Sequence, residues 1–268
     1  MGRLVKAELL KLFTTRLWWG MAIAVLLSGA GFALLFGLLF MSESLAEDAG
    51  GPGGLPSGDA VQIANSVYTG GLSVGYLLML TIGVLQIGME YRHQTITSTF
   101  LAVPQRVRAM LAKVVALLAI ATAYGLLSLV GSVSVGALVL NLRGADAFPS
   151  TELLRTLALS LLVLGLWALI GLGLGILIPN QVAALLIGIG TAWIVEPLAG
   201  LAIKAFEFGR ENIAPFLPSE ATSAIVNAVQ ASPDDVRLSW YAAALALAGW
   251  AALLAGSGIW RTVRQDVT

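Results

Sequence analysis

Six long stretches of this sequence contain almost no charged residue, and they constrain the fold more than any other feature. Their bounds are residues 17–42, 68–89, 114–142, 156–178, 182–203 and 240–260. At about 1.5 Å per residue, each stretch is long enough as an α-helix to cross the roughly 30 Å hydrocarbon core of a bilayer. A helix also satisfies its backbone hydrogen bonds within the segment, as a membrane requires. The pattern predicts an all-α, polytopic membrane protein of one domain, residues 1–268, with six transmembrane helices.

The charge content supports this interpretation. Charged residues make up 11% of the 268 residues, against about 25% in a typical soluble domain. They cluster between the apolar stretches, whereas a soluble fold needs charge over most of its surface. The net charge is zero, and no nucleic-acid partner is expected. The chain has no cysteine, which excludes disulfides, thiolate metal ligands and a cysteine nucleophile.

The first apolar stretch follows four basic residues, so a cleaved signal peptide is a competing interpretation. The apolar region of a signal peptide is only 7–15 residues long, which favours a retained span here. Before it, residues 1–16 are amphipathic and predict an interfacial helix. One face carries Leu4, Val5, Leu9, Leu10, Leu12 and Phe13, and the other carries Arg3, Glu8, Lys11, Thr14 and Thr15. The alternative is a solvated extension of the first span.

The distribution of basic residues predicts the orientation, since cytoplasmic loops of membrane proteins are enriched in Lys and Arg. Ten lie before the first span, between spans two and three, or after the last span: Arg3, Lys6, Lys11, Arg16, Arg92, Arg106, Arg108, Lys113, Arg261 and Arg264. The other five are Arg143, Arg155, Lys204, Arg210 and Arg237. We therefore expect a multi-pass protein of the cell (plasma) membrane with both termini in the cytoplasm.

The remaining segments are interpreted by composition. Residues 43–59 are rich in glycine and predict a flexible outer loop. Residues 204–239 predict two short outer helices, the first capped by Ser219 and the second beginning at residues 232–235. Small residues at spacings of four predict close packing between spans. They are Ser128, Ser132, Gly136, Gly171 and Gly175.

No catalytic pattern emerges from the residues. None of the four lysines follows the glycines of a phosphate-binding loop, and the only histidine, His93, lies outside the spans. No cluster of ligands predicts a metal site. We expect no enzymatic activity and no cofactor bound by this chain.

The segment between the second and third spans, residues 90–113, has its own pattern. Glu90 ends the span, Thr95 is a candidate helix cap, and Pro104 ends a short helix. The helix is expected to present Ile96, Phe100 and Leu101 to the cytoplasm as an apolar patch, which calls for an apolar partner.

This segment resembles the cytoplasmic loop of type-2 ATP-binding-cassette (ABC) exporter permeases, in which an acidic residue and Arg precede a Thr, an apolar run, Pro-x-Arg and a Lys. Three other segments also resemble these permeases. They are Glu8-x-x-Lys11-Leu12-x-Thr14-Thr15-Arg16-x-Trp18, Trp193-x-x-Glu196 and Phe216-Leu217-Pro218. One departure is Gln94, where many relatives carry Gly.

The resemblance implies a permease that pairs with an identical or paralogous permease and docks a separate ABC ATPase subunit, which binds ATP and Mg. Residues 95–103 would be the coupling helix, and the outer helices would close the exit. The implied ATPase contacts are Glu90, Tyr91, Arg92, Thr95, Ile96, Thr99, Phe100, Leu101, Pro104 and Arg106. The alternative is an ATP-independent transporter or channel, which would require charged or polar residues deep in several spans. Only Gln86 and Glu196 approach that requirement.

Glu196 is the exit-region candidate, and two interpretations stay open. It lies in the outer half of the fifth span and is followed by Pro197. Either its carboxylate reaches the outer headgroups, or it turns inward and interacts with a cationic substrate group, Lys204 or Arg210.

Overall fold

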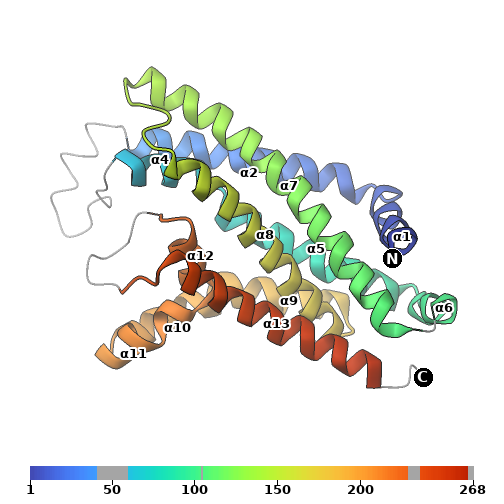
Figure 1. The fold of residues 1–268 in the computed structure, drawn as a ribbon. Helices are drawn as coiled ribbons and strands as arrows, with labels where there is room; N and C mark the ends of the chain where they lie inside the picture. Colours follow the sequence, from blue (N-terminus) through green and yellow to red (C-terminus); the bar gives the residue numbers. More distant parts are fainter. Residues whose placement is uncertain (41–59, 104, 229–235, 265–268) are drawn as a thin grey trace.

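A computed structural model describes residues 1–40, 60–103, 105–228 and 236–264, and the regular secondary structure in this part of the chain is all helical, without a strand (Figure 1). The α-helices are α1 (Gly2–Phe13), α2 (Leu17–Phe40), α4 (Ala60–Thr69), α5 (Leu72–Arg92), α6 (Ile96–Ala102), α7 (Arg106–Leu142), α8 (Glu152–Leu177), α9 (Gln181–Gly190), α10 (Glu196–Lys204), α11 (Glu207–Asn212), α12 (Pro218–Ile225) and α13 (Trp240–Arg264). A π-helical turn, Thr191–Val195, joins α9 to α10, and a 3₁₀ turn, Ala214–Phe216, precedes α12. The all-α fold class is confirmed.

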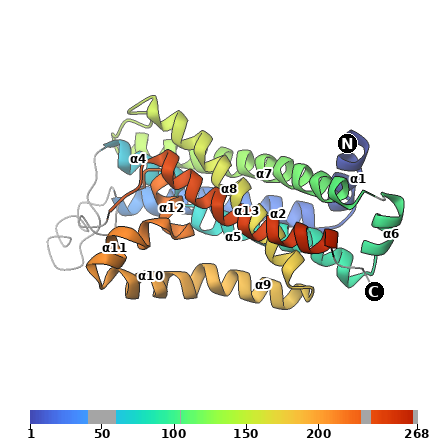
Figure 2. The ribbon, with the colours of Figure 1, turned by 60° about the horizontal axis from the view of Figure 1, so that its bottom comes forward.

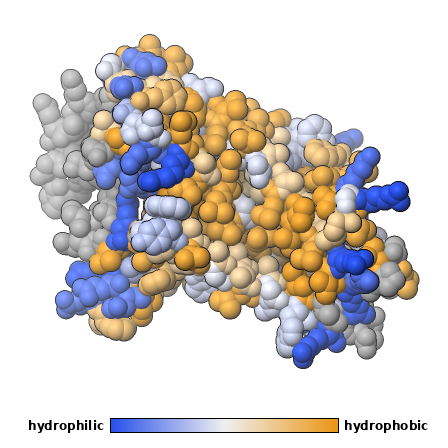
Figure 3. Space-filling model, viewed as in Figure 1, coloured by the Kyte–Doolittle hydropathy of each residue, from blue (hydrophilic) through white to orange (hydrophobic). Residues whose placement is uncertain are grey.

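Six helical segments of the described chain are long and apolar enough to cross a membrane, as predicted. They are Leu17–Leu39, Ala60–Arg92, Arg106–Leu142, Glu152–Leu177, Gln181–Lys204 and Trp240–Thr262. Apolar side chains cover the middle of the molecule, and hydrophilic side chains gather at both ends (Figure 3). This distribution is that of a polytopic membrane protein.

The two ends of the molecule differ in the segments that form them. The N-terminus, α1, α6 and the end of α13 lie at one end, on the right of Figure 1. The start of α4, the turn between α7 and α8, and α11 lie at the opposite end. The segments with ten of the fifteen basic residues meet at the first end. We call it the basic end and the other the distal end.

The second and third spans extend beyond their predicted bounds. The second begins at Ala60 rather than residue 68, because its polar residues Asn65 and Thr69 are buried between helices instead of facing water. The Thr69 hydroxyl donates to the Asn65 carbonyl at 2.7 Å. The third span begins at Arg106, since residues 106–113 continue α7 toward the basic end.

Small residues bring the spans together, as predicted. A Cβ on Gly171 of α8 would lie 2.0 Å from the Leu80 carbonyl oxygen of α5, and one on Gly83 would lie 2.1 Å from the Ala168 carbonyl oxygen. On the other side of α8, a Cβ on Gly173 would meet the backbone of α13 at 2.4 Å. α8 therefore packs backbone to backbone between α5 and α13, and the Gly171–Gly175 stripe has a packing role.

Two short helices, α11 and α12, lie between the fifth and sixth spans, as the fold prediction required. Their positions differ in part. α12 begins at Pro218, close to the predicted start, whereas α11 was not anticipated. The predicted start at 232–235, the predicted loop at 43–59 and Pro104 lie outside the described residues.

Candidate functional site

The α5–α6–α7 segment at the basic end holds most of the predicted site residues. α5 ends at Arg92, and Gln94 adopts φ 54°, the left-handed region that glycine favours. The position where the exporter permeases often carry Gly is thus one where the backbone of this chain turns sharply. α6 begins at Ile96 with Thr95 as its N-cap residue, although the Thr95 side chain makes no capping hydrogen bond.

α6 turns its large apolar side chains inward, which corrects the predicted cytoplasmic patch. Ile96 and Phe100 are only 4% and 9% exposed and belong to the core under the spans. Only Leu101 of that patch faces outward, at 78% exposure. The reason is that the turn at Gln94 folds α6 back under the bundle, where its inner face covers apolar span ends.

Further contacts fix the return to α7. The Arg106 guanidinium lies 5.5 Å from the centre of the Phe100 ring and donates to the Thr262 carbonyl of α13 at 3.2 Å. Tyr91 and Thr99 are half-buried, whereas Arg92 and Thr95 are exposed. The predicted contact residues therefore separate into an inward set that holds α6 in place and an outward set around Leu101.

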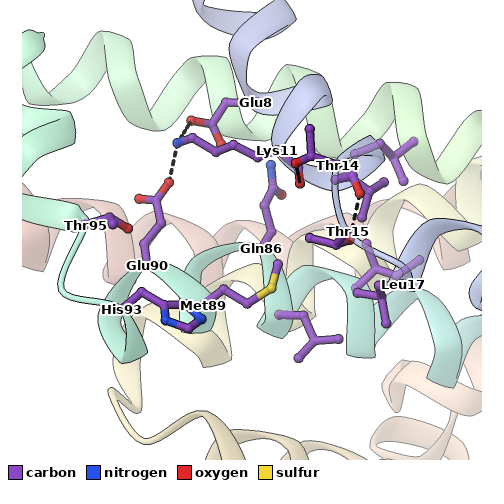
Figure 4. A pocket seen from close by; sticks show the side chains of 14 residues that line it. Glu8, Lys11, Thr14, Thr15, Leu17, Gln86, Met89, Glu90, His93 and Thr95 are labelled. Atoms are coloured by element: carbon purple, nitrogen blue, oxygen red, sulfur yellow. Dashed lines mark hydrogen bonds and ion pairs between the residues drawn. The ribbon is translucent and has the colours of Figure 1, made fainter.

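Four charged side chains from three helices form a largely buried cluster beside α6, and Figure 4 draws three of them, Glu8, Lys11 and Glu90. Lys11 Nζ lies 2.7 Å from Glu8 Oε1 and 2.5 Å from Glu90 Oε1. Lys113 Nζ lies 2.9 Å from Glu8 Oε2 and 2.5 Å from Glu90 Oε1. Each lysine touches both carboxylates, so the cluster is electrically balanced and joins α1, α5 and α7. We call these four residues the charge cluster.

Burial makes this cluster costly to disrupt. The Lys113 side chain is 0% exposed, and both carboxylates are nearly so. Burial acts to lower the pKa of Lys11, but hydrogen bonds and charge interactions with Glu8 and Glu90 raise it, and the pKa ends above its ordinary value of 10.5. A buried ion that lost its partners would be strongly destabilising.

Of the four residues of the charge cluster, only Glu90 was predicted from the sequence as a site residue. Glu8 was placed with Arg3, Lys11, Thr14 and Thr15 on the polar face of residues 1–16, but its side chain is buried and pairs with Lys113 of α7. Exposed Leu10 and Phe13 lie on the outward side of α1 instead. Two features of the sequence could have indicated the cluster. Glu8 and Lys11 lie three residues apart, and the opposite charges of Glu90 and Lys113 lie at the end of the second span and the predicted start of the third.

Glu196 takes a third position that neither interpretation anticipated. Its carboxylate is buried, and its Oε1 accepts the backbone N–H of Ser219, in the first turn of α12, at 2.5 Å. Lys204, one of the cationic partners suggested for Glu196, pairs with Glu220 at 2.6 Å. Ser219 is thus not the cap of its own helix; an acid from α10 accepts its N–H.

Glu196 also lines a cavity between the fifth span and the rest of the bundle. The volume is about 340 Å³, and the lining is mostly apolar, including Trp167, Leu217 and Trp250. The Trp167 indole donates to the Thr222 hydroxyl of α12 at 2.9 Å. Glu196 and Trp167 therefore fix α12 against the spans from two sides.

Comparison with known protein families finds no match, and comparison with curated proteins finds none either. Across the part of the chain that the structure describes, no group of three or more His, Asp or Glu side chains is placed to hold a metal ion.

Proposed function

We propose that this chain is the membrane-spanning permease subunit of an ATP-driven exporter. It would work as a pair of permeases, identical or paralogous, in the cell (plasma) membrane with the basic end in the cytoplasm. ATP and Mg would bind to a separate ABC ATPase subunit docked on α6, and this chain would carry out no hydrolysis itself.

The observation that carries the proposal is the seating of α6. It lies at the basic end, its inner face is held by Ile96 and Phe100, and its outer face projects Leu101. Glu90 joins the end of α5 to the first turns of α7 through Lys113. A push on α6 by a partner would therefore be transmitted to spans rather than absorbed by a loose loop. This geometry, added to the sequence resemblance at residues 90–113, supports the role of a coupling helix.

The alternative, an ATP-independent transporter or channel, has less support. It calls for polar groups deep in several spans that could carry an ion or proton. The Glu196 carboxylate already accepts the Ser219 N–H, and Gln86 lies about two turns before the end of α5 rather than deep in the span.

The decisive experiment is co-purification of the chain with an ABC ATPase subunit expressed from the same cells. Leu101→Asp should reduce ATPase binding at least tenfold, because it places a charge in an apolar contact while leaving the core of this chain untouched. Leu142→Asp is the matched control, with 76% exposure at the distal end. Phe100→Asp is unsuitable, since Phe100 is buried in the chain itself.

Equal ATPase binding by wild type, Leu101→Asp and Leu142→Asp would refute the docking role of α6. Failure to recover any ATPase, together with substrate transport by the purified chain alone in vesicles, would favour the ATP-independent alternative.

A further inference from the structure

The outward face of α1 combines two cations with two large apolar side chains. At about 100° per residue, Arg3, Lys6, Leu10 and Phe13 lie within about 80° of one another around the helix. All four side chains are exposed, Leu10 to 52% and Phe13 to 54%. Buried Leu12 lies on the other side of the helix. We call the four exposed residues the α1 stripe.

The rotation of α1 about its own axis is fixed by contacts on the side that faces the bundle. Leu12 belongs to the hydrophobic core, and the Glu8 carboxylate lies 2.9 Å from Lys113 Nζ of α7. Turning the stripe inward would break both contacts. The stripe therefore faces away from the chain and is available to whatever surrounds it.

The stripe lies at the level where the first span begins. α1 runs across the direction of the spans rather than along it (Figure 2). The Phe13 ring lies 5.8 Å from the ring of Trp18, in the first turn of α2, in an edge-to-face arrangement. Trp18 and Trp19 are 40% and 50% exposed, and tryptophan is enriched where a membrane meets water. The stripe thus continues the lipid-facing surface of the first span at the level of the headgroups.

The two cations of the stripe are not matched by carboxylates of the chain. No ion pair joins Arg3 or Lys6 to an acidic residue within the described ranges. Lys11, on the flank of α1, does pair with acids of the charge cluster. Unmatched cations beside exposed apolar side chains fit a surface that is anionic outside and apolar beneath.

A leaflet that contains acidic phospholipids is such a surface. Long Arg and Lys side chains can reach its headgroups while apolar side chains of the same helix lie among the first carbons of the acyl chains. The Phe13–Trp18 contact extends the stripe onto a membrane span, where lipid rather than a soluble protein is the neighbour. These features together favour lipid as the occupant.

We propose that the α1 stripe binds the phosphate headgroup of an anionic phospholipid in the leaflet at the basic end. Arg3 and Lys6 would donate to the phosphate oxygens, and Leu10 and Phe13 would lie against the acyl chains. A bound lipid would favour the position of α1 in which Glu8 reaches the charge cluster. The surface needs no ATPase partner, so it stands independently of the exporter proposal.

The test uses the full chain, purified in detergent without a partner, with equimolar phosphatidylglycerol and phosphatidylcholine of identical acyl chains as probes. Native mass spectrometry measures how much of each lipid the chain retains. One cation near an anionic surface corresponds to about a fivefold change in affinity, so wild type should prefer phosphatidylglycerol about twenty-five-fold. Arg3→Gln/Lys6→Gln should remove this preference. Both side chains are exposed, so its thermal unfolding should match that of wild type.

Two further variants separate charge from apolar contact. Arg92→Gln/Arg108→Gln is the matched control, because it removes two exposed cations at the same end, from α5 and α7, and it should keep the preference. Leu10→Gln/Phe13→Gln should weaken retention of both lipids by a similar factor and leave the preference intact, since it changes only the apolar part of the stripe.

Three results would overturn the proposal. The first is no preference for phosphatidylglycerol in wild type, or an equal preference in wild type and Arg3→Gln/Lys6→Gln. The second is an equal loss of preference in Arg92→Gln/Arg108→Gln, which would mean that the lipid responds to net charge rather than to α1. The third is displacement of phosphatidylglycerol by inorganic phosphate beyond that caused by sodium chloride at the same ionic strength, which would indicate a site for free anions.

Discussion

Replacing Lys113 by Met tests whether the charge cluster holds the basic end together. Met has a similar length but removes the only fully buried cation of the cluster, whose Nζ lies 2.9 Å from Glu8 and 2.5 Å from Glu90. Two buried carboxylates would then share Lys11, whose side chain is 44% exposed. Removing one partner of a buried ion pair costs about 3–5 kcal/mol, so Lys113→Met should lower the free energy of unfolding by that amount.

Lys204→Met is the matched comparison at the distal end. Lys204 also pairs with a glutamate, at 2.6 Å, but both side chains are partly exposed. Pairs of this kind are worth about 0–1 kcal/mol. The assay is reversible unfolding in mixed micelles with increasing SDS, followed by the fluorescence of the seven tryptophans. Both variants can be measured under the same conditions.

The double variant Glu90→Gln/Lys113→Met makes the test specific for charge. It removes one charge of each sign and leaves the Glu8–Lys11 pair. The loss of unfolding free energy in the double variant should therefore be smaller, by at least 1 kcal/mol, than the sum of the losses in the two single variants. The charge cluster does not hold the basic end together if Lys113→Met costs no more stability than Lys204→Met, or if the effects of the two single changes add without coupling.

Three further predictions concern packing, orientation and pH. Gly171→Ala should prevent stable folding, because the new Cβ would lie 2.0 Å from a backbone oxygen of α5, whereas Gly249→Ala, with nothing within 4 Å, should be neutral in a thermal unfolding assay. In whole cells, an impermeant thiol reagent should label Thr151→Cys but not Gln105→Cys, and the reverse pattern would invert the proposed orientation. Because the pKa of Lys11 is raised above 10.5, its ion pairs stabilise fully below that pH and are lost as the pH rises through the folded-state pKa. The decline in stability above about pH 10.5 should therefore be shallower in Lys11→Met, and an unchanged pH profile would contradict this account.

The candidate site could be predicted from the sequence only in part. The position and length of α6 follow from Thr95, the apolar run after it and the charged residues around it, all local in the chain. The direction that α6 faces does not follow, since Ile96 and Phe100 are apolar whether they meet a partner or the underside of their own bundle. Leu101 is equally apolar, and its sequence position does not show that it is the residue that faces outward.

The sequence by itself determined the number of spans, the helical class and the difference in charge between the two ends. These properties depend on the length of uncharged segments and on the cost of placing charge in lipid, and both are read along a single chain. Tertiary structure decided which charges are buried together and which groups fix the short helices. Glu8 meets Lys113, and Glu196 accepts the N–H of Ser219, only because separate helices pack side by side. Helical periodicity places a side chain on a face of its own helix, but the neighbour that covers that face is chosen by the packing of the whole bundle.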